Sequence, residues 1–230
     1  MPPPIVRNPG SAPAAPQLQR SYKIVVYAHE TAASLLAGFN SLGLARGSGA
    51  PSDEQQDLLR AMLVFAGAGL DACAQQIVRD ALPRLVAKDD DARTALIRFA
   101  ARHLRQGEGD SDSGAVDAKV LATLLLGSPA QDLVELLIND LTGSSMQSVE
   151  ELKRVVTCLG LVKDRQLLAT IQGTREAFKV RNRISHDMDV NFTSNPRRNR
   201  TLRRRDDMVR DTNVLLGVAE ALVVAADKAL

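Results

Sequence analysis

Residues 52–83 read SDEQQDLLRAMLVFAGAGLDACAQQIVRDALP, and this stretch decides the fold class. Its large apolar side chains recur at intervals of three and four residues, which is the period of an α-helix with a buried face. Ser52 followed by Gln55 predicts a capping box at the start of the helix. Pro83 predicts its end. The stretch therefore predicts one long helix in the core of the protein.

The middle of this helix contains the run Ala66-Gly67-Ala68-Gly69. Each glycine costs a helix about 1 kcal/mol relative to alanine, so the run predicts a close crossing with a second helix that needs the missing side chains. A phosphate-binding loop is the less favoured interpretation. No strand precedes the run, and no Lys-Ser or Lys-Thr pair follows it.

Composition extends the helical interpretation to the whole chain. Aromatic residues make up only 3% and Trp is absent, whereas β-sandwich and barrel cores depend on aromatic and β-branched side chains. The shares of hydrophobic residues (45%) and charged residues (24%) exclude wholesale disorder. The chain is thus expected to be all-α, a bundle of about seven or eight helices with no strand longer than three or four residues. Apolar periodicity and caps place the further helices at about 18–45, 90–106 and 116–126, from 129, from 148, and at about 163–186 and 200–228.

The proline-rich N-terminal residues, the apolar runs and the few cysteines and histidines lead to further expectations. Residues 1–16 hold six of the ten prolines, which predicts a disordered tail followed by a single domain from 17 to 230. No apolar run reaches the length of about 18 residues that a membrane span requires. Two cysteines and three scattered histidines show no disulfide framework and no zinc spacing. We therefore expect a cytoplasmic protein with no metal, no cofactor and no membrane partner.

Charge is unevenly distributed. Residues 175–210 contain eleven basic and five acidic residues, a net charge of +6, which leaves −4 for the rest of the chain. A segment of this kind can present a positive surface although the whole chain is nearly neutral. Phosphate groups are the commonest partners of such a surface.

The same segment contains the sequence FKVRNRISHDMDV at 178–190. Histidine moves protons near neutral pH, and the fork of arginine N–H groups matches phosphate oxygens. Arg181, Asn182 and His186 together offer what metal-free RNA cleavage needs. Asn182 and His186 share a helix face, whereas Arg181 and His186 lie about 140° apart on an ideal helix. The alternative is a helix end where His186 caps carbonyl groups and the arginines are solvated.

This segment resembles the HEPN superfamily, whose hallmark is an arginine, a polar residue and a histidine four to six residues after the arginine. The order 181–186 has that spacing, and the apolar-small-His ending at 184–186 and the acidic continuation at 187–189 also resemble the family. Residues 60–71 look like the early core helix of the RiboL-PSP-type subgroup. The matching features span roughly 54–226.

The resemblance implies an all-α bundle that forms a homodimer with a composite active site, in which two motifs face each other. It also implies a metal-independent endoribonuclease, in which the RNA 2′-hydroxyl attacks the adjacent phosphate and leaves a 2′,3′-cyclic phosphate. His186 would act as general base or acid, Arg181 would bind the scissile phosphate, and Asn182 would orient one of them. Many relatives carry an arginine where this chain has Val180.

Secondary candidates surround the motif. Asp71 is expected to form a salt bridge with a motif arginine, either as structural support or as part of the site. The run 197–205 is interpreted as a phosphate-binding rim, or alternatively as a solvated helix start. The residues expected to bind RNA are Lys179, Arg183, Arg197, Arg198, Arg203 and Arg204.

Three function hypotheses remain open at the level of sequence. The first is an endoribonuclease of the toxin or antiviral defence type, controlled by an antitoxin or another regulatory partner. The second is a non-catalytic HEPN-like module that binds RNA, a nucleotide or a partner. The third is a helical interaction protein without a site. The first is favoured because Arg181, Asn182 and His186 are all present.

Overall fold

The computed structural model describes residues 4–47, 49–105, 129–190 and 200–230. These residues form eight α-helices and no named strand, so the prediction of an all-α protein is confirmed. Within the described ranges the only β-type pairing is an isolated bridge between Val190 and Arg200. The helix expected near 116–126 lies outside the described residues. The elements are η1 (Pro16–Leu18), α1 (Gln19–Arg46), α2 (Asp53–Lys88), α3 (Asp90–Arg105), α5 (Pro129–Thr142), α6 (Val149–Cys158), α7 (Arg165–Gln172), α8 (Arg175–Asp187) and α9 (Arg205–Ala229).

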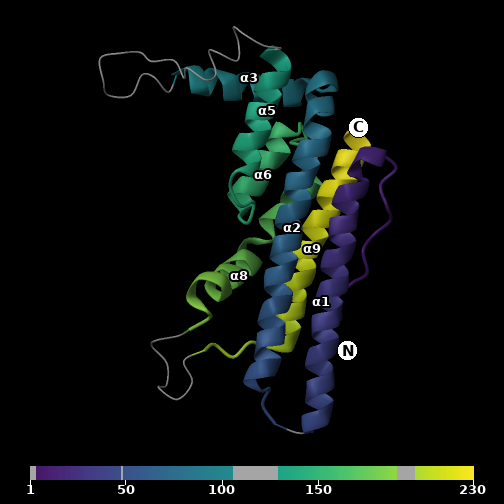
Figure 1. Ribbon diagram of the computed structural model, residues 1–230, viewed down its shortest axis with the longest axis vertical. Helices are drawn as coiled ribbons and strands as arrows, with labels where there is room; N and C mark the ends of the chain where they lie inside the picture. The colour runs from purple at the N-terminus through teal and green to yellow at the C-terminus, as the bar shows by residue number, and fades with distance from the viewer. Residues whose placement is uncertain (1–3, 48, 106–128, 191–199) are drawn as a thin grey trace, which may run out of the picture.

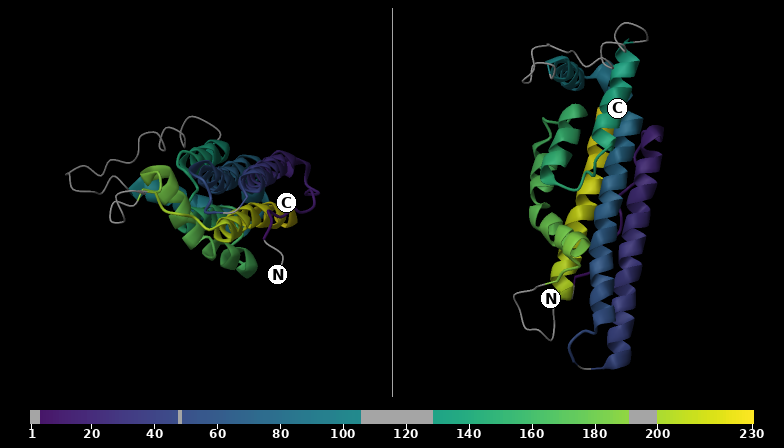
Figure 2. Two further views of the ribbon diagram at one scale, coloured as in Figure 1. Left: turned by 90° about the horizontal axis from the view of Figure 1, so that it is seen from below. Right: turned by 60° about the vertical axis from the view of Figure 1, so that its left-hand side comes forward.

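Three long helices form the body of the protein (Figure 1). α2 is the central one, because it packs against both α1 and α9 and also touches α3, α5, α6 and α8. Its inward face contributes fully buried side chains such as Leu63, Leu70 and Ile77. The shorter helices flank the long ones on one side, with α5 and α6 toward one end and α8 toward the other (Figure 2).

The start of α2 follows the predicted capping box, but its end does not follow the prediction. Ser52 accepts a hydrogen bond from the Gln55 amide, and the Gln55 side chain accepts one from the Ser52 amide. The helix continues through Pro83 to Lys88, so the expected end at Pro83 is wrong. Leu82 and Leu85 on either side of the proline are fully buried. Their burial outweighs the backbone hydrogen bond that a proline cannot donate.

By length and composition alone, α2 is apolar enough to cross a membrane. Half of its most apolar window is buried inside the protein. A helix at the centre of a bundle is long and apolar because its neighbours bury it, so it passes the same test of length and composition.

The close helix crossing predicted from the glycine run is confirmed. A Cβ atom on Gly69 would lie 2.4 Å from the Cβ of Ala28 in α1. A Cβ atom on Gly67 would lie 3.4 Å from the Cγ of Arg181 in α8. Gly69 is therefore needed for the close approach of α1, whereas Gly67 lies beneath the Arg181 side chain of α8.

The single helix expected over 163–186 is divided in two, so that expectation is wrong. Gly173 and Thr174 separate α7 from α8. Thr174 is fully buried, and its hydroxyl donates to the Ile171 carbonyl at 2.7 Å. A side-chain bond of this kind competes with the helical backbone ladder. The break lets Ile171 of α7 and Phe178 of α8 both reach the core.

Residues 4–15, here called the N-terminal strap, differ from the expected disordered tail. The strap lies along α1 and reaches α9 (Figure 1). The Arg7 amide donates to Asn213 at 3.0 Å, and the Ala14 and Ala15 amides donate to the Asp227 carboxylate. Val6 is buried. Prolines hold much of the backbone near its final conformation, which lowers the entropy lost when the strap is ordered.

A buried histidine of α1 links the strap to α9. His29 of α1 is only 3% exposed, with Nδ1 2.6 Å from the Arg7 carbonyl oxygen and Nε2 2.6 Å from a Glu220 carboxylate oxygen. The Arg7 carbonyl oxygen can only accept, so Nδ1 donates to it, and Nε2 faces the Glu220 carboxylate as an ion-pair partner. This arrangement favours the imidazolium form, whose charge pairs with Glu220 on α9 and raises the pKa of His29.

Candidate functional site

The motif helix α8 lies against α2 through one face. Ala177, Phe178 and Ile184 are buried on that face, and Arg181 lies between them on the helix surface. The opposite face, which carries Lys179 and His186, is exposed. Burial of three apolar side chains fixes the rotation of α8 and thereby directs Arg181 toward α2.

Arg181 is half-buried, and two contacts hold its side chain. Its aliphatic chain packs across Gly67, where an added Cβ atom would make only an ordinary contact of 3.4 Å with Cγ. Its Nη1 donates to the Asn182 side-chain oxygen at 3.0 Å. Burial lowers the pKa of the guanidinium, and the charge of Asp71 opposes that effect. The Nε of Arg181 is buried without a hydrogen-bond partner among the described residues. This pre-oriented cation retains an unused donor.

Asp71 anchors a loop rather than the motif. It accepts hydrogen bonds from the Met146 amide at 2.8 Å and from the side chains of Gln147 and Gln75, each at 3.2 Å. These contacts hold the segment that leads into α6. The ion pairs of the described residues include none between Asp71 and Arg181. The interaction of Asp71 with Arg181 is thus through charge alone, and its contacts favour the supporting role over a direct one.

His186 lies in the last turn of α8 and is exposed. It has no hydrogen-bond or ion-pair partner among the described residues. The helix stays regular through Asp187, so the separation of about 140° between Arg181 and His186 persists. One chain therefore directs the arginine inward and the histidine outward. Asn182, half-buried, lies between them on the helix surface.

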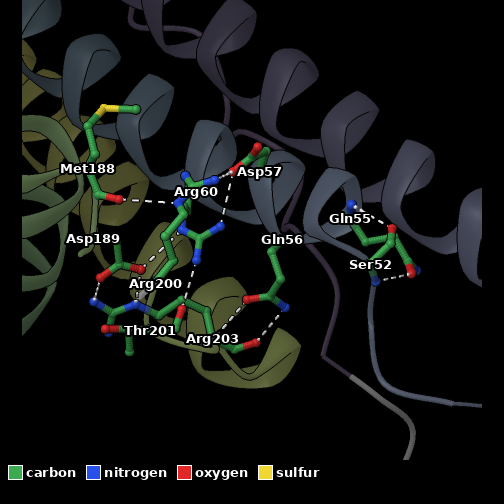
Figure 3. A network of polar contacts seen from close by, with 10 residues as sticks. All are labelled: Ser52, Gln55, Gln56, Asp57, Arg60, Met188, Asp189, Arg200, Thr201 and Arg203. Atoms are coloured by element: carbon green, nitrogen blue, oxygen red, sulfur yellow. Dashed lines mark hydrogen bonds and ion pairs between the residues drawn. The ribbon is translucent and has the colours of Figure 1, made fainter. Parts of the chain in front are cut away.

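The turn after His186 is held by a buried network (Figure 3). Asp189 has a fully buried side chain that accepts from Arg60 Nε at 3.1 Å and from Arg203 Nε at 2.9 Å. A second bond joins Arg203 Nη2 to the other oxygen of Asp189. Burial alone would raise the pKa of the Asp189 carboxyl, but the hydrogen bonds and charges of Arg203 and Arg60 hold the pKa below its ordinary value.

The expected RNA-binding residues separate into three groups. Lys179 and Arg203 have partners within the protein, Glu176 at 2.7 Å and Asp189 respectively. Arg183 and Arg204 are exposed and have no partner among the described residues. Arg197 and Arg198 lie outside the described residues. Two of the expected cations therefore remain free for an external anion in the described part of the chain.

Sequence reasoning missed the role of Asp189. From the sequence alone, Asp189 is only part of the acidic continuation of the motif. Its partners Arg60 and Arg203 come from elements 129 and 14 residues away. The one available signal was an acidic residue inside a strongly basic segment, a position that favours ion pairing.

No group of three or more His, Cys, Asp or Glu side chains in the described ranges is arranged to hold a metal ion. No family model, no curated protein and no solved structure matches this chain.

Proposed function

We propose that this protein is a metal-independent endoribonuclease. The RNA 2′-oxygen attacks the adjacent phosphorus, the bond from phosphorus to the 5′-oxygen breaks, and the products are a 2′,3′-cyclic phosphate and a 5′-hydroxyl. A base takes the 2′-hydroxyl proton and an acid returns one to the leaving oxygen. His186 serves in this proton transfer, Arg181 stabilises the charge on the phosphate, and Asn182 fixes Arg181.

The observation that carries the proposal is the placement of Arg181. A guanidinium held against Gly67 and bonded to Asn182 is oriented before any substrate arrives. Preorganised donors stabilise a charged transition state without reorganisation at the moment of reaction. A purely solvated surface arginine would have neither the packing against α2 nor the buried Nε.

A homodimer completes the proposed site. Arg181 and His186 lie on different faces of α8 in one chain, and one histidine cannot serve at once as base and acid. A second copy that brings its motif against the first supplies the other histidine. Exposed Arg183 and Arg204 then hold the flanking phosphates.

The second candidate is a non-catalytic RNA-binding module. It is favoured by the same separation of Arg181 and His186 on α8, because a binding surface does not require them to meet. This module would bind RNA with a strong salt dependence and leave it intact.

The test is cleavage of labelled mixed-sequence RNA in the presence of EDTA, with the products analysed for the cyclic phosphate. We expect folded His186→Ala and Arg181→Ala to lose about 100- to 10,000-fold in rate. His103→Ala is the matched control, since His103 packs on Phe99 of α3, and it should cleave like the wild type. Full activity in folded His186→Ala contradicts the proposal, and salt-dependent binding without cleavage selects the second candidate.

A further inference from the structure

The backbone after the motif helix adopts an unfavourable conformation. Met188 and Asp189 have φ angles of 51° and 59°, in the left-handed region that residues other than glycine rarely adopt. Their amides both donate to the Arg183 carbonyl, so the chain turns sharply at the end of α8. Two consecutive L-residues in the left-handed region persist only where surrounding contacts enforce them.

The enforcing contacts converge on Asp189. Its carboxylate joins Arg60 of α2 to Arg203, which lies two residues before the start of α9. Its carbonyl oxygen accepts from the Thr201 amide at 2.9 Å, and the Thr201 carbonyl accepts from Arg60 at 2.8 Å. The Gln56 side chain bonds both the amide and the carbonyl of Arg203. Two separate segments, α2 and the stretch before α9, are thus fastened to the turn (Figure 3).

This network is specific in its geometry. Arg203 binds both carboxylate oxygens with a planar fork, which lysine cannot reproduce. A buried ion pair is weak evidence for stability, because desolvation offsets much of the attraction. The best-established role of a buried ion pair is to select one conformation among several alternatives. The arrangement fixed here is the turn that begins at Met188, two residues after His186.

We infer that Asp189, held by Arg60 and Arg203, is a positioning residue for His186, an inference that rests on the proposed ribonuclease function. His186 lies in the last turn of α8, so the direction in which its side chain leaves the helix depends on that turn staying closed. The turn at Met188 and Asp189 sets the end of α8, and the Asp189 network sets the turn.

The test compares Asp189→Asn with Asp187→Asn. Both variants remove one negative charge from the same turn, but the Asp187 side chain is exposed and has no partner among the described residues. Asn at 189 keeps the shape and loses the charge that pairs with two arginines. We expect Asp189→Asn to lower kcat about 100-fold with KM nearly unchanged. Asp187→Asn should stay within about 3-fold of the wild type, as surface substitutions do.

A double variant separates positioning from general loosening of the fold. If Asp189 acts through His186, adding Asp189→Asn to His186→Ala should cost no further activity. An equal further loss in that background overturns the inference. Should Asp189→Asn fail to fold, Arg203→Lys, which keeps the charge and loses the fork, takes its place in the same comparison.

Nuclear magnetic resonance of the His186 imidazole keeps the inference testable without RNA cleavage. We expect one sharp ring signal in the wild type and in Asp187→Asn, and a broadened or multiple signal in Asp189→Asn. Identical His186 signals in all three overturn the inference. A wild type that leaves RNA intact but shows this signal pattern contradicts the proposed function alone.

Discussion

The two glycines of α2 predict opposite responses to the same substitution. Gly69→Ala places a Cβ atom 2.4 Å from the Cβ of Ala28, whereas carbon atoms in contact lie about 3.5–4.0 Å apart. α1 must then move by about 1 Å. Overpacking of this kind costs about 1–3 kcal/mol, and the alanine returns about 1 kcal/mol of helix propensity. The net expectation is a loss of about 1 kcal/mol in the free energy of unfolding.

Gly67→Ala is the matched variant two residues away. Its Cβ atom would lie 3.4 Å from the Cγ of Arg181, an ordinary contact with a flexible side chain. The helix-propensity gain of up to about 1 kcal/mol should therefore be retained. The two variants should differ by about 2 kcal/mol, which for a chain of this size corresponds to about 4–8 °C in Tm.

The assay is urea unfolding followed by far-ultraviolet circular dichroism, with thermal melts alongside. Ala28→Gly supplies the control, because it removes the atom with which the new side chain of Gly69→Ala collides. In the Ala28→Gly background Gly69→Ala should become neutral or stabilising, a coupling that a double-mutant cycle measures. Equal stability of Gly69→Ala and Gly67→Ala in the wild-type background would refute the close approach of α1 and α2.

Two further predictions concern ionisable side chains that hold distant segments together. Burial lowers the pKa of His29, but its bonds to Glu220 and the Arg7 carbonyl raise it more, so the folded pKa lies above the ordinary value. The stabilisation is then full below about pH 6.5 and is lost as the pH rises through the folded pKa. Glu220→Gln should flatten the fall in Tm over that range, and parallel melts of wild type and variant check it. Asp71→Ala removes the acceptor of the Met146 amide, and it should cost about 1.5–3 kcal/mol. Hydrogen exchange at that amide should accelerate, and unchanged protection would contradict the anchoring role.

Local chemistry made part of the fold predictable. The capping box expected at Ser52 and Gln55 is present, and of the one expected at Ser148 and Glu151 only the bond from the Glu151 amide to the Ser148 hydroxyl is found. The glycine run in α2 also correctly predicted the crossing with α1. A glycine lowers helix stability, so it is expected inside a helix where a second helix packs too closely for a side chain. These signals lie within a few residues of the element that they predict.

The features that the sequence predicted wrongly depend on contacts between distant segments. The continuation of α2 past Pro83 depends on burial of Leu85, and the order of the strap depends on Asn213 and Asp227, about 200 residues away in the chain. Asp189 was overlooked for the same reason, since Arg60 reaches it across 129 residues. Contacts between distant segments decide these features, and no local pattern encodes them.

The strap has a consequence for the way the chain folds during synthesis. α1 and α2 can pair as soon as both have been made, but α9 begins more than a hundred residues after α2 ends. At about 5–20 residues per second, ribosomes leave the nascent hairpin without α9 for several seconds. During that interval the face of α2 that carries Cys73, later covered by α9, is open to chaperones or to a neighbouring nascent chain. The strap, although it is made early, can close only after α9 has docked.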